Sequence, residues 1–263
     1  MLGKLLKYDL KWIYKLIGIF YILAFIASVA GRCLASIKNS VVFSIAARIV
    51  YGFAISMMVS SLINCLMRTW VRFIRNIYKD ESYLTHTLPI EKKTIYASKV
   101  LAAIICTFTT VIVAVVCLFI CYYSEANMQV VKSVLELAAS TYDTTVLNLL
   151  LLITITVFVE VLFIIVIGFV GIILGNKSNH NKMAKSILIG FVLYTITQVV
   201  TLGIIGIIGL FNPSIMNLIN TTDVIDINAV KNVIYLAIGI YTVYTIIYYI
   251  LGKKQLEKGV NVE

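Results

Sequence analysis

The sequence has few of the residues that interrupt apolar helices. Its 263 residues include only two prolines, Pro89 and Pro213, and no serine-, glycine- and proline-rich linker. Charged residues make up 13% of the chain, whereas hydrophobic residues make up 61%, compared with roughly 45–50% in soluble domains. A soluble core cannot hide that much apolar surface, so part of it must face lipid. We expect a single transmembrane domain over residues 1–263.

The chain also lacks the residues from which catalytic and metal sites are built. Its only histidines are His86 and His180, and Glu160 is the only acidic residue deep within an apolar run. The five cysteines show no CxxC spacing, so packed thiols are expected in place of a metal site. No G-x-x-x-x-G-K-[ST] loop is present to hold ATP phosphates. These absences argue against a membrane-embedded hydrolase and against any cofactor bound by this chain.

Six apolar runs are long enough to cross a bilayer as helices, which takes about 20 residues each. They lie approximately at 13–31, 41–66, 100–123, 146–174, 187–210 and 233–251. In lipid, a helix is the only backbone state that satisfies the polar groups of such runs, even where isoleucine and valine dominate. The sequence therefore predicts an all-α integral membrane protein with six transmembrane helices.

Lysine and arginine are distributed unequally between the two sides of these spans. Sixteen lie in the N-terminal segment, in the loops after the second and fourth spans, and in the C-terminal tail, whereas four lie in the other loops. Because positive residues accumulate in cytoplasmic loops, both termini are expected in the cytoplasm. The net charge of +10 thus reflects membrane topology, and no nucleic-acid partner is expected.

The first span has a competing interpretation. Lysines followed by an apolar run that ends at Ser28, Val29 and Ala30 are also typical of a cleavable signal peptide. A lipoprotein signal is excluded, because Arg32 precedes Cys33 where a small residue would be needed.

Two cytoplasmic segments are expected to be helical. Residues 1–11 place leucines on one helical face and lysines on another, which predicts an amphipathic helix lying in the membrane interface. Residues 68–79 place apolar side chains on one face and a basic stripe on the opposite face. Pro89 is expected at the first position of the next helix, with Glu91 in its first turn. The alternative for 68–79 is an interfacial helix with a solvated basic face.

The segment Tyr78–Pro89, YKDESYLTHTLP, followed by Ser98 and Lys99 at the start of a span, resembles the cytoplasmic loop of ATP-binding-cassette (ABC) transporter permeases of the type 2 exporter family. The sequence KLLKYDLK at residues 4–11 is similar to the N-terminal helix of such permeases. Six spans with both ends inside match the family as well. The two motifs are short, and the rest of the chain matches in topology only.

The resemblance implies a permease subunit in a bacterial cell membrane, embedded in membrane lipid. It would pair with a second permease chain, identical or homologous, and with two cytoplasmic ABC ATPase subunits that bind ATP and magnesium. The loop 68–99 would carry a coupling helix that docks on the ATPase. Carried onto this chain, the coupling residues are Asp80, Glu81, Tyr83, Leu84, His86 and Pro89. The implied function is ATP-driven export of a peptide, a lipid-like or a drug-like substrate, and this chain would not itself be an enzyme.

Two charged residues inside spans are further candidates. Glu160 lies near the middle of the fourth span and Arg48 in the outer half of the second. Because a charged group at this depth is costly, we expect Glu160 to line a substrate path or to pair with Arg48. A permanent buried pair or a protonated Glu160 would be purely structural. A proton-coupled secondary transporter that uses Glu160, and a non-catalytic membrane partner or sensor, are the alternatives to the permease.

Glycines recur in two spans. Gly171 and Gly175 form a small-xxx-small pair that favours close approach of a neighbouring helix. Gly203, Gly206 and Gly209 favour either packing or bending of the fifth span.

Overall fold

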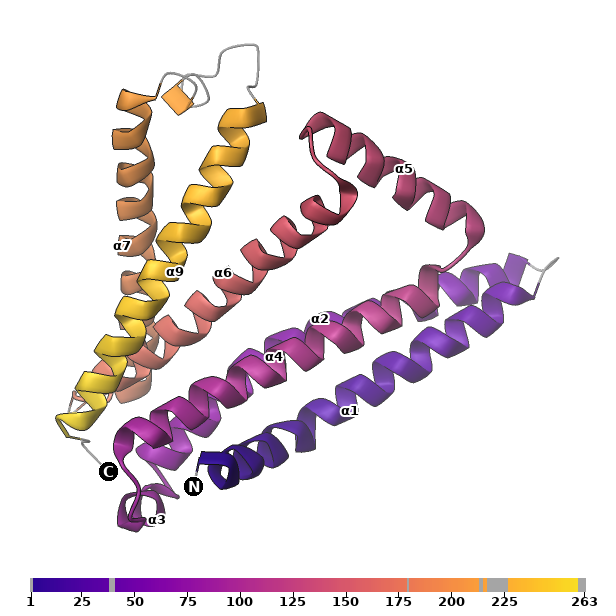
Figure 1. Ribbon diagram of the computed structural model, residues 1–263. Coiled ribbons are helices and arrows are strands. Elements are labelled where there is room, and N and C mark those ends of the chain that lie inside the picture. The colour runs from indigo at the N-terminus through magenta and orange to yellow at the C-terminus, as the bar shows by residue number, and fades with distance from the viewer. Residues whose placement is uncertain (1, 38–40, 179, 213–214, 217–226, 260–263) are drawn as a thin grey trace. The chain divides into compact units, whose positions relative to one another are not determined.

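The computed structural model of the chain is built from helices (Figure 1). It describes residues 2–37, 41–178, 180–212, 215–216 and 227–259, and these contain no strand. Six helices are long and apolar enough to cross a membrane. They are α1 (Leu2–Ser36), α2 (Val41–Ile77), α4 (Lys92–Tyr122), α6 (Val146–Gly175), α7 (Lys182–Phe211) and α9 (Ile227–Glu257). The predicted all-helical fold is confirmed, and six helices have the length and composition of membrane spans.

Contacts within the chain divide it into two compact units, Met1–Gln129 and Val130–Asn261. The first contains α1, α2, α4 and the short helix α3 (Ser82–Thr87), and the second contains α6, α7 and α9. Helix α5 (Glu125–Thr141) contains the boundary between them. That the whole chain forms one membrane domain stays a prediction.

In the first unit, α1, α2 and α4 pack against one another along their lengths. The contact is close because the buried side chains are small, among them Ala24, Ala54 and Cys117. Two tyrosine hydroxyls of α1 lie 2.6 Å from threonine hydroxyls of α4, in the pairs Tyr14–Thr109 and Tyr21–Thr110. Small residues and hydroxyl pairs of this kind hold helices together in lipid, where apolar surface alone gives little preference for a neighbouring helix.

In the second unit, α6 lies against both α7 and α9. Its Phe163 is fully buried, with four tyrosine rings around it at centroid distances of 5.2 to 6.4 Å; these belong to Tyr194, Tyr241, Tyr244 and Tyr248. A Cβ atom added to Gly171 would lie 2.8 Å from Cα of Gly190 on α7. The expected close approach at the α6 glycines is therefore present.

The glycines of α7 differ from those of α6. A Cβ atom added at Gly203 or Gly206 would meet no atom within 4 Å in the described part of the chain. Packing inside the second unit therefore does not explain these two positions. Residues 213–214 and 217–226, which include the expected turn at Pro213, lie outside the described residues.

The ends of the helices differ from the predictions in three places. Residues 2–11 are not a separate interfacial helix but the first turns of α1, and their Leu6 and Leu10 pack against buried residues of the first unit. The predicted helix over 68–79 is the last part of α2, which ends at Ile77. Pro89 lies before α4, and Glu91 is its N-cap residue, so neither is in the first turn. Contacts between helices thus extend the spans beyond their apolar runs.

Candidate functional site

A cluster of charged side chains is buried at one end of the first unit. It contains Asp9 near the beginning of α1, Arg72 near the end of α2 and Lys99 near the beginning of α4. Glu81, in the turn before α3, joins them. The three positions meet because α2 runs in the opposite direction to α1 and α4, so that its end lies beside their beginnings (Figure 1).

Asp9 is the centre of this cluster. Its Oδ1 accepts hydrogen bonds from Lys99 Nζ at 2.6 Å and from Arg72 Nε at 3.0 Å. Its Oδ2 accepts a bond of 3.3 Å from the hydroxyl of Ser98. The amide oxygen of Asn76 accepts a further bond from Lys99. One carboxylate of α1 thereby binds directly to side chains of both neighbouring spans.

Glu81 connects the turn before α3 to this cluster. Both of its carboxylate oxygens accept hydrogen bonds from Arg72 Nη1, at 2.8 and 2.6 Å, and Oε2 accepts one of 2.6 Å from Asn76 Nδ2. Arg72 therefore bridges two carboxylates, Asp9 and Glu81. The cluster therefore contains two carboxylates and two cationic groups. Their mutual attraction offsets the free-energy cost of removing these charges from water.

The basic stripe of α2 lies against an aromatic ring. The guanidinium carbons of Arg68, Arg72 and Arg75 lie 4.4, 5.3 and 5.9 Å from the centroid of the Trp12 ring on α1. Guanidinium groups within about 6 Å of an aromatic centroid are attracted by its negative face. The alternative of a solvated basic face is therefore wrong for Arg72, which is 8% exposed, whereas Lys79 of the same stripe is exposed.

Helix α3 presents one face to the protein and leaves the other free. Ser82 and Thr85 are buried, whereas Tyr83 and Leu84 are 77% and 68% exposed. The Thr85 hydroxyl donates to the carbonyl of Glu81 at 3.0 Å. Tyr78, just before the turn, is buried, and burial raises its pKa above the ordinary value of 10.0. A short helix with a fixed base thus carries two large, exposed side chains.

The remaining predicted coupling residues lie around this helix. Asp80 forms an exposed ion pair with Arg75, with 3.1 Å between Oδ2 and Nη2. The ring Nε2 of His86 donates to the carbonyl of Ile77 at 3.1 Å, which ties the end of α3 to the end of α2. Pro89 is exposed in the segment before α4. The structure thus brings the predicted residues together, but it gives them different positions, with Glu81 facing inward and Tyr83 and Leu84 facing outward.

The two charged residues within spans are not part of this cluster. Glu160 is exposed on α6 of the second unit, and Arg48 is exposed on α2 of the first. Within the described part of its own unit, Glu160 has no ion pair. Their pairing, and a substrate path lined by Glu160, stay predictions.

Sequence reasoning singled out none of Asp9, Arg72, Asn76 and Lys99 as a site residue. One signal was present: Asp9 is the only acidic residue among the first 79, in a segment that contains many basic ones. An isolated carboxylate beside a basic stripe has a strong electrostatic preference for a partner from that stripe. In the described residues, no group of three or more His, Cys, Asp or Glu side chains is arranged to hold a metal ion.

Comparisons of the chain with protein-family models, with curated proteins and with solved structures found no match.

Proposed function

We propose that the chain is the permease subunit of an ATP-driven exporter and that α3 is its coupling helix. One observation carries the proposal: a short helix with an exposed apolar surface is bonded at its base to a buried charge cluster shared by three spans. Such a helix has a surface for a partner, formed by Tyr83 and Leu84, and a rigid connection to the membrane helices. The resemblance of residues 78–89 to the exporter loop supports the same assignment.

The connection suggests how force would pass from a partner to the spans. Glu81 lies immediately before α3 and binds Arg72 and Asn76 of α2. Those two side chains bind Asp9 of α1 and Lys99 of α4. A displacement of α3 by an ATPase subunit would therefore pull on three spans at once. The ATPase, with its ATP and magnesium, would be a separate polypeptide, since this chain has no phosphate-binding loop of the usual kind.

The proposal includes an orientation. Both termini, the segment 68–99 that contains α3, and the loop after α6 carry most of the basic residues, which favours the cytoplasmic side for all of them. An ATPase in the cytoplasm could then reach α3. The cargo would be a peptide, a lipid-like or a drug-like molecule moved out of a bacterial cell through a pair of permease chains.

The test is recovery and crosslinking of the ATPase. The tagged chain is extracted from its native membrane in mild detergent, with a photoreactive benzoylphenylalanine in place of Tyr83. We expect a crosslink to a protein that contains a G-x-x-x-x-G-K-[ST] loop and hydrolyses ATP. Leu84→Glu should lower its recovery at least fivefold, because a charge replaces an apolar contact.

Tyr8 provides the matched control, since it is an exposed tyrosine (66%) on α1 in the same unit. Benzoylphenylalanine at Tyr8 should give no ATPase crosslink, and Tyr8→Ala should leave recovery unchanged. If no ATPase is recovered with the unsubstituted chain under mild extraction, the exporter proposal is wrong. If an ATPase is recovered equally from the Leu84→Glu variant, α3 is not its docking site.

A further inference from the structure

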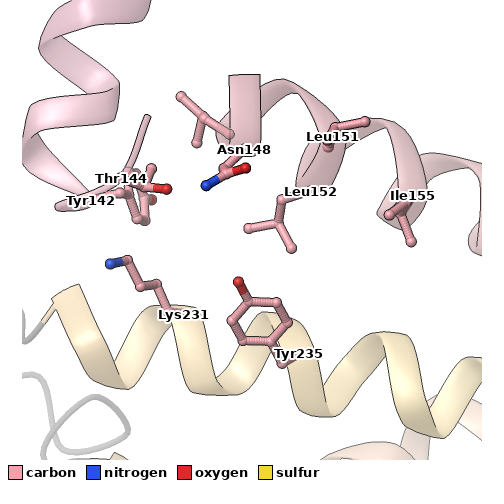
Figure 2. Close-up of a pocket in the computed structure, with 9 residues that line it drawn as sticks. Tyr142, Thr144, Asn148, Leu151, Leu152, Ile155, Lys231 and Tyr235 are labelled. Atoms are coloured by element: carbon pink, nitrogen blue, oxygen red, sulfur yellow. The ribbon is translucent and has the colours of Figure 1, made fainter. Parts of the chain in front are cut away.

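A pocket of about 260 Å³ lies in the second unit, between the beginning of α6 and the first turns of α9. Figure 2 shows Asn148 and Leu152 of α6 facing Lys231 and Tyr235 of α9 across it. All of its lining residues belong to this one unit. Its volume is close to the lower limit of about 300 Å³ for pockets that hold drug-sized ligands. The pocket is therefore large enough for a small headgroup and the first part of a chain.

The wall nearest the ends of the helices is polar. The ammonium of Lys231, the hydroxyl of Tyr235, the amide of Asn148 and the hydroxyl of Thr144 line it (Figure 2). Lys231 Nζ donates a 3.3 Å hydrogen bond to the main-chain carbonyl of Asp143, which uses one of its three hydrogens. No carboxylate among the described residues lies within 4.0 Å of it. The pocket thus has a cation with capacity to bind an anion.

The opposite wall is apolar and runs along α6. Leu151, Leu152 and Ile155 follow Asn148 at helical spacing on the side that lines the pocket. With a rise of 1.5 Å per residue, the wall extends about 10 Å from Asn148 to Ile155. It continues into an apolar helix long enough to cross a membrane. A hydrocarbon chain lying on this wall would therefore lead into the apolar layer of the bilayer.

We propose that this pocket binds an anionic amphiphile, with a phosphate or carboxylate headgroup at Lys231 and a hydrocarbon chain along Leu151, Leu152 and Ile155. The headgroup would form a charge-assisted hydrogen bond with the ammonium, and Tyr235 and Asn148 would donate further bonds. A bilayer phospholipid and a free amphiphile share this chemistry. The proposal requires only that α6 and α9 lie in a membrane, so it does not depend on the proposed coupling to an ATPase.

The test uses the purified full-length chain in phosphatidylcholine nanodiscs that contain a small fraction of a phosphatidylglycerol with a diazirine in its acyl chain. After irradiation, peptides that carry the lipid are identified by mass spectrometry. We expect labelling within residues 148–155. Lys231→Met should lower that labelling at least fivefold and Lys231→Arg should retain most of it. Leu152→Trp, which fills the pocket, should abolish it.

Lys132 gives the matched control, because its side chain on α5 is exposed and lies outside the pocket. Lys132→Met should leave the labelling unchanged, and size-exclusion profiles show that each variant remains folded. Octyl phosphate should compete with the probe, which identifies a free amphiphile as an occupant, whereas failure to compete identifies a bilayer lipid. Equal labelling by a phosphatidylcholine probe, or unchanged labelling in Lys231→Met, would overturn the proposal. Equal competition by inorganic phosphate would overturn the part assigned to the hydrocarbon chain.

Discussion

The ammonium of Lys99 lies 2.6 Å from Oδ1 of Asp9, although the two residues are 90 positions apart in the chain. Both side chains are buried, at 3% and 2% exposure. The pair joins the beginnings of α1 and α4, and Arg72 joins α2 to the same carboxylate. One acidic residue therefore links all three long helices of the first unit.

Asp9→Asn should destabilise the first unit strongly. The substitution leaves Arg72 and Lys99 buried with one negative partner fewer, and breaking a buried pair in this way costs about 3–5 kcal/mol. Asp80→Asn is the control, since Asp80 belongs to an exposed pair whose loss costs about 0–1 kcal/mol. Thermal unfolding in detergent, followed by fluorescence-detected size exclusion, measures both. Equal unfolding midpoints for Asp9→Asn and Asp80→Asn would show that the buried cluster does not stabilise the protein.

Glu81→Ala should release α3 from α2 without unfolding the spans. Its carboxylate forms the bonds to Arg72 and Asn76 that hold the base of the helix. A nitroxide attached at Tyr83→Cys reports the mobility of α3 through its electron paramagnetic resonance spectrum. The lines of that spectrum should become narrower in the Glu81→Ala variant, because α3 moves more freely. Glu91→Ala provides the comparison, because Glu91 is exposed and its ion pair joins it to nearby Lys93 on the protein surface. An unchanged spectrum in Glu81→Ala would mean that other contacts hold α3.

Gly175→Ala should separate α6 from α7. A Cβ atom at this position would overlap the backbone of Ser186, and a backbone cannot move aside as a flexible side chain does. Overpacking of this kind costs about 1–3 kcal/mol. Gly203→Ala, in open space on α7, should leave the unfolding midpoint unchanged or raise it slightly, since alanine favours helix more than glycine does. An equal decrease of the unfolding midpoint in both variants would contradict close packing at Gly175.

The proposed orientation can be tested with the native cysteines. Cys33, near the end of α1, is exposed, and the other four are buried. With cytoplasmic termini, Cys33 should react with a membrane-impermeant maleimide in intact cells. In a Cys33→Ser background, Lys254→Cys should react only after the membrane is permeabilised. The reverse pattern would place both termini outside and remove α3 from the reach of a cytoplasmic ATPase.

The predicted pairing of Arg48 and Glu160 requires that the two side chains meet. In a Cys33→Ser background, Arg48→Cys and Glu160→Cys should be joined by a short bifunctional thiol reagent. Arg48→Cys with Leu188→Cys serves as the comparison, since Leu188 is an exposed residue of α7 and should give a lower yield. Glu160→Gln should then impair transport while leaving assembly intact. Absence of the crosslink would leave Glu160 without the proposed partner.

The spans could be predicted because each apolar run is long enough to specify a helix in lipid by itself. The ends of the helices could not, because they depend on neighbours. Residues 2–11 have the leucine and lysine pattern of an interfacial helix, yet Leu10 packs inside the first unit and Asp9 binds two other spans. The sequence shows which faces are apolar, but not which helices are adjacent.

The candidate site could be predicted only in part, because the sequence does not show which helices are adjacent. Residues 80–89 were identified through a short motif, and the structure places them together on and around α3. The charges that bind the base of this helix come from residues 9, 72 and 99, which only the packing of three helices brings together. Two of them, Arg72 and Lys99, belong to the predicted loop 68–99, and the sequence pattern does not show that their charges are buried.

The spacing of the cluster along the chain also sets an order of biosynthesis. Asp9 is translated 63 residues before Arg72 and 90 before Lys99. During translation, its carboxylate can therefore pair with Arg72 first, and it meets Lys99 only after the beginning of α4 has left the ribosome. A chain interrupted between these two points would leave Asp9 with one of its two cationic partners. The cluster is thus complete only after the beginning of α4 has been synthesised.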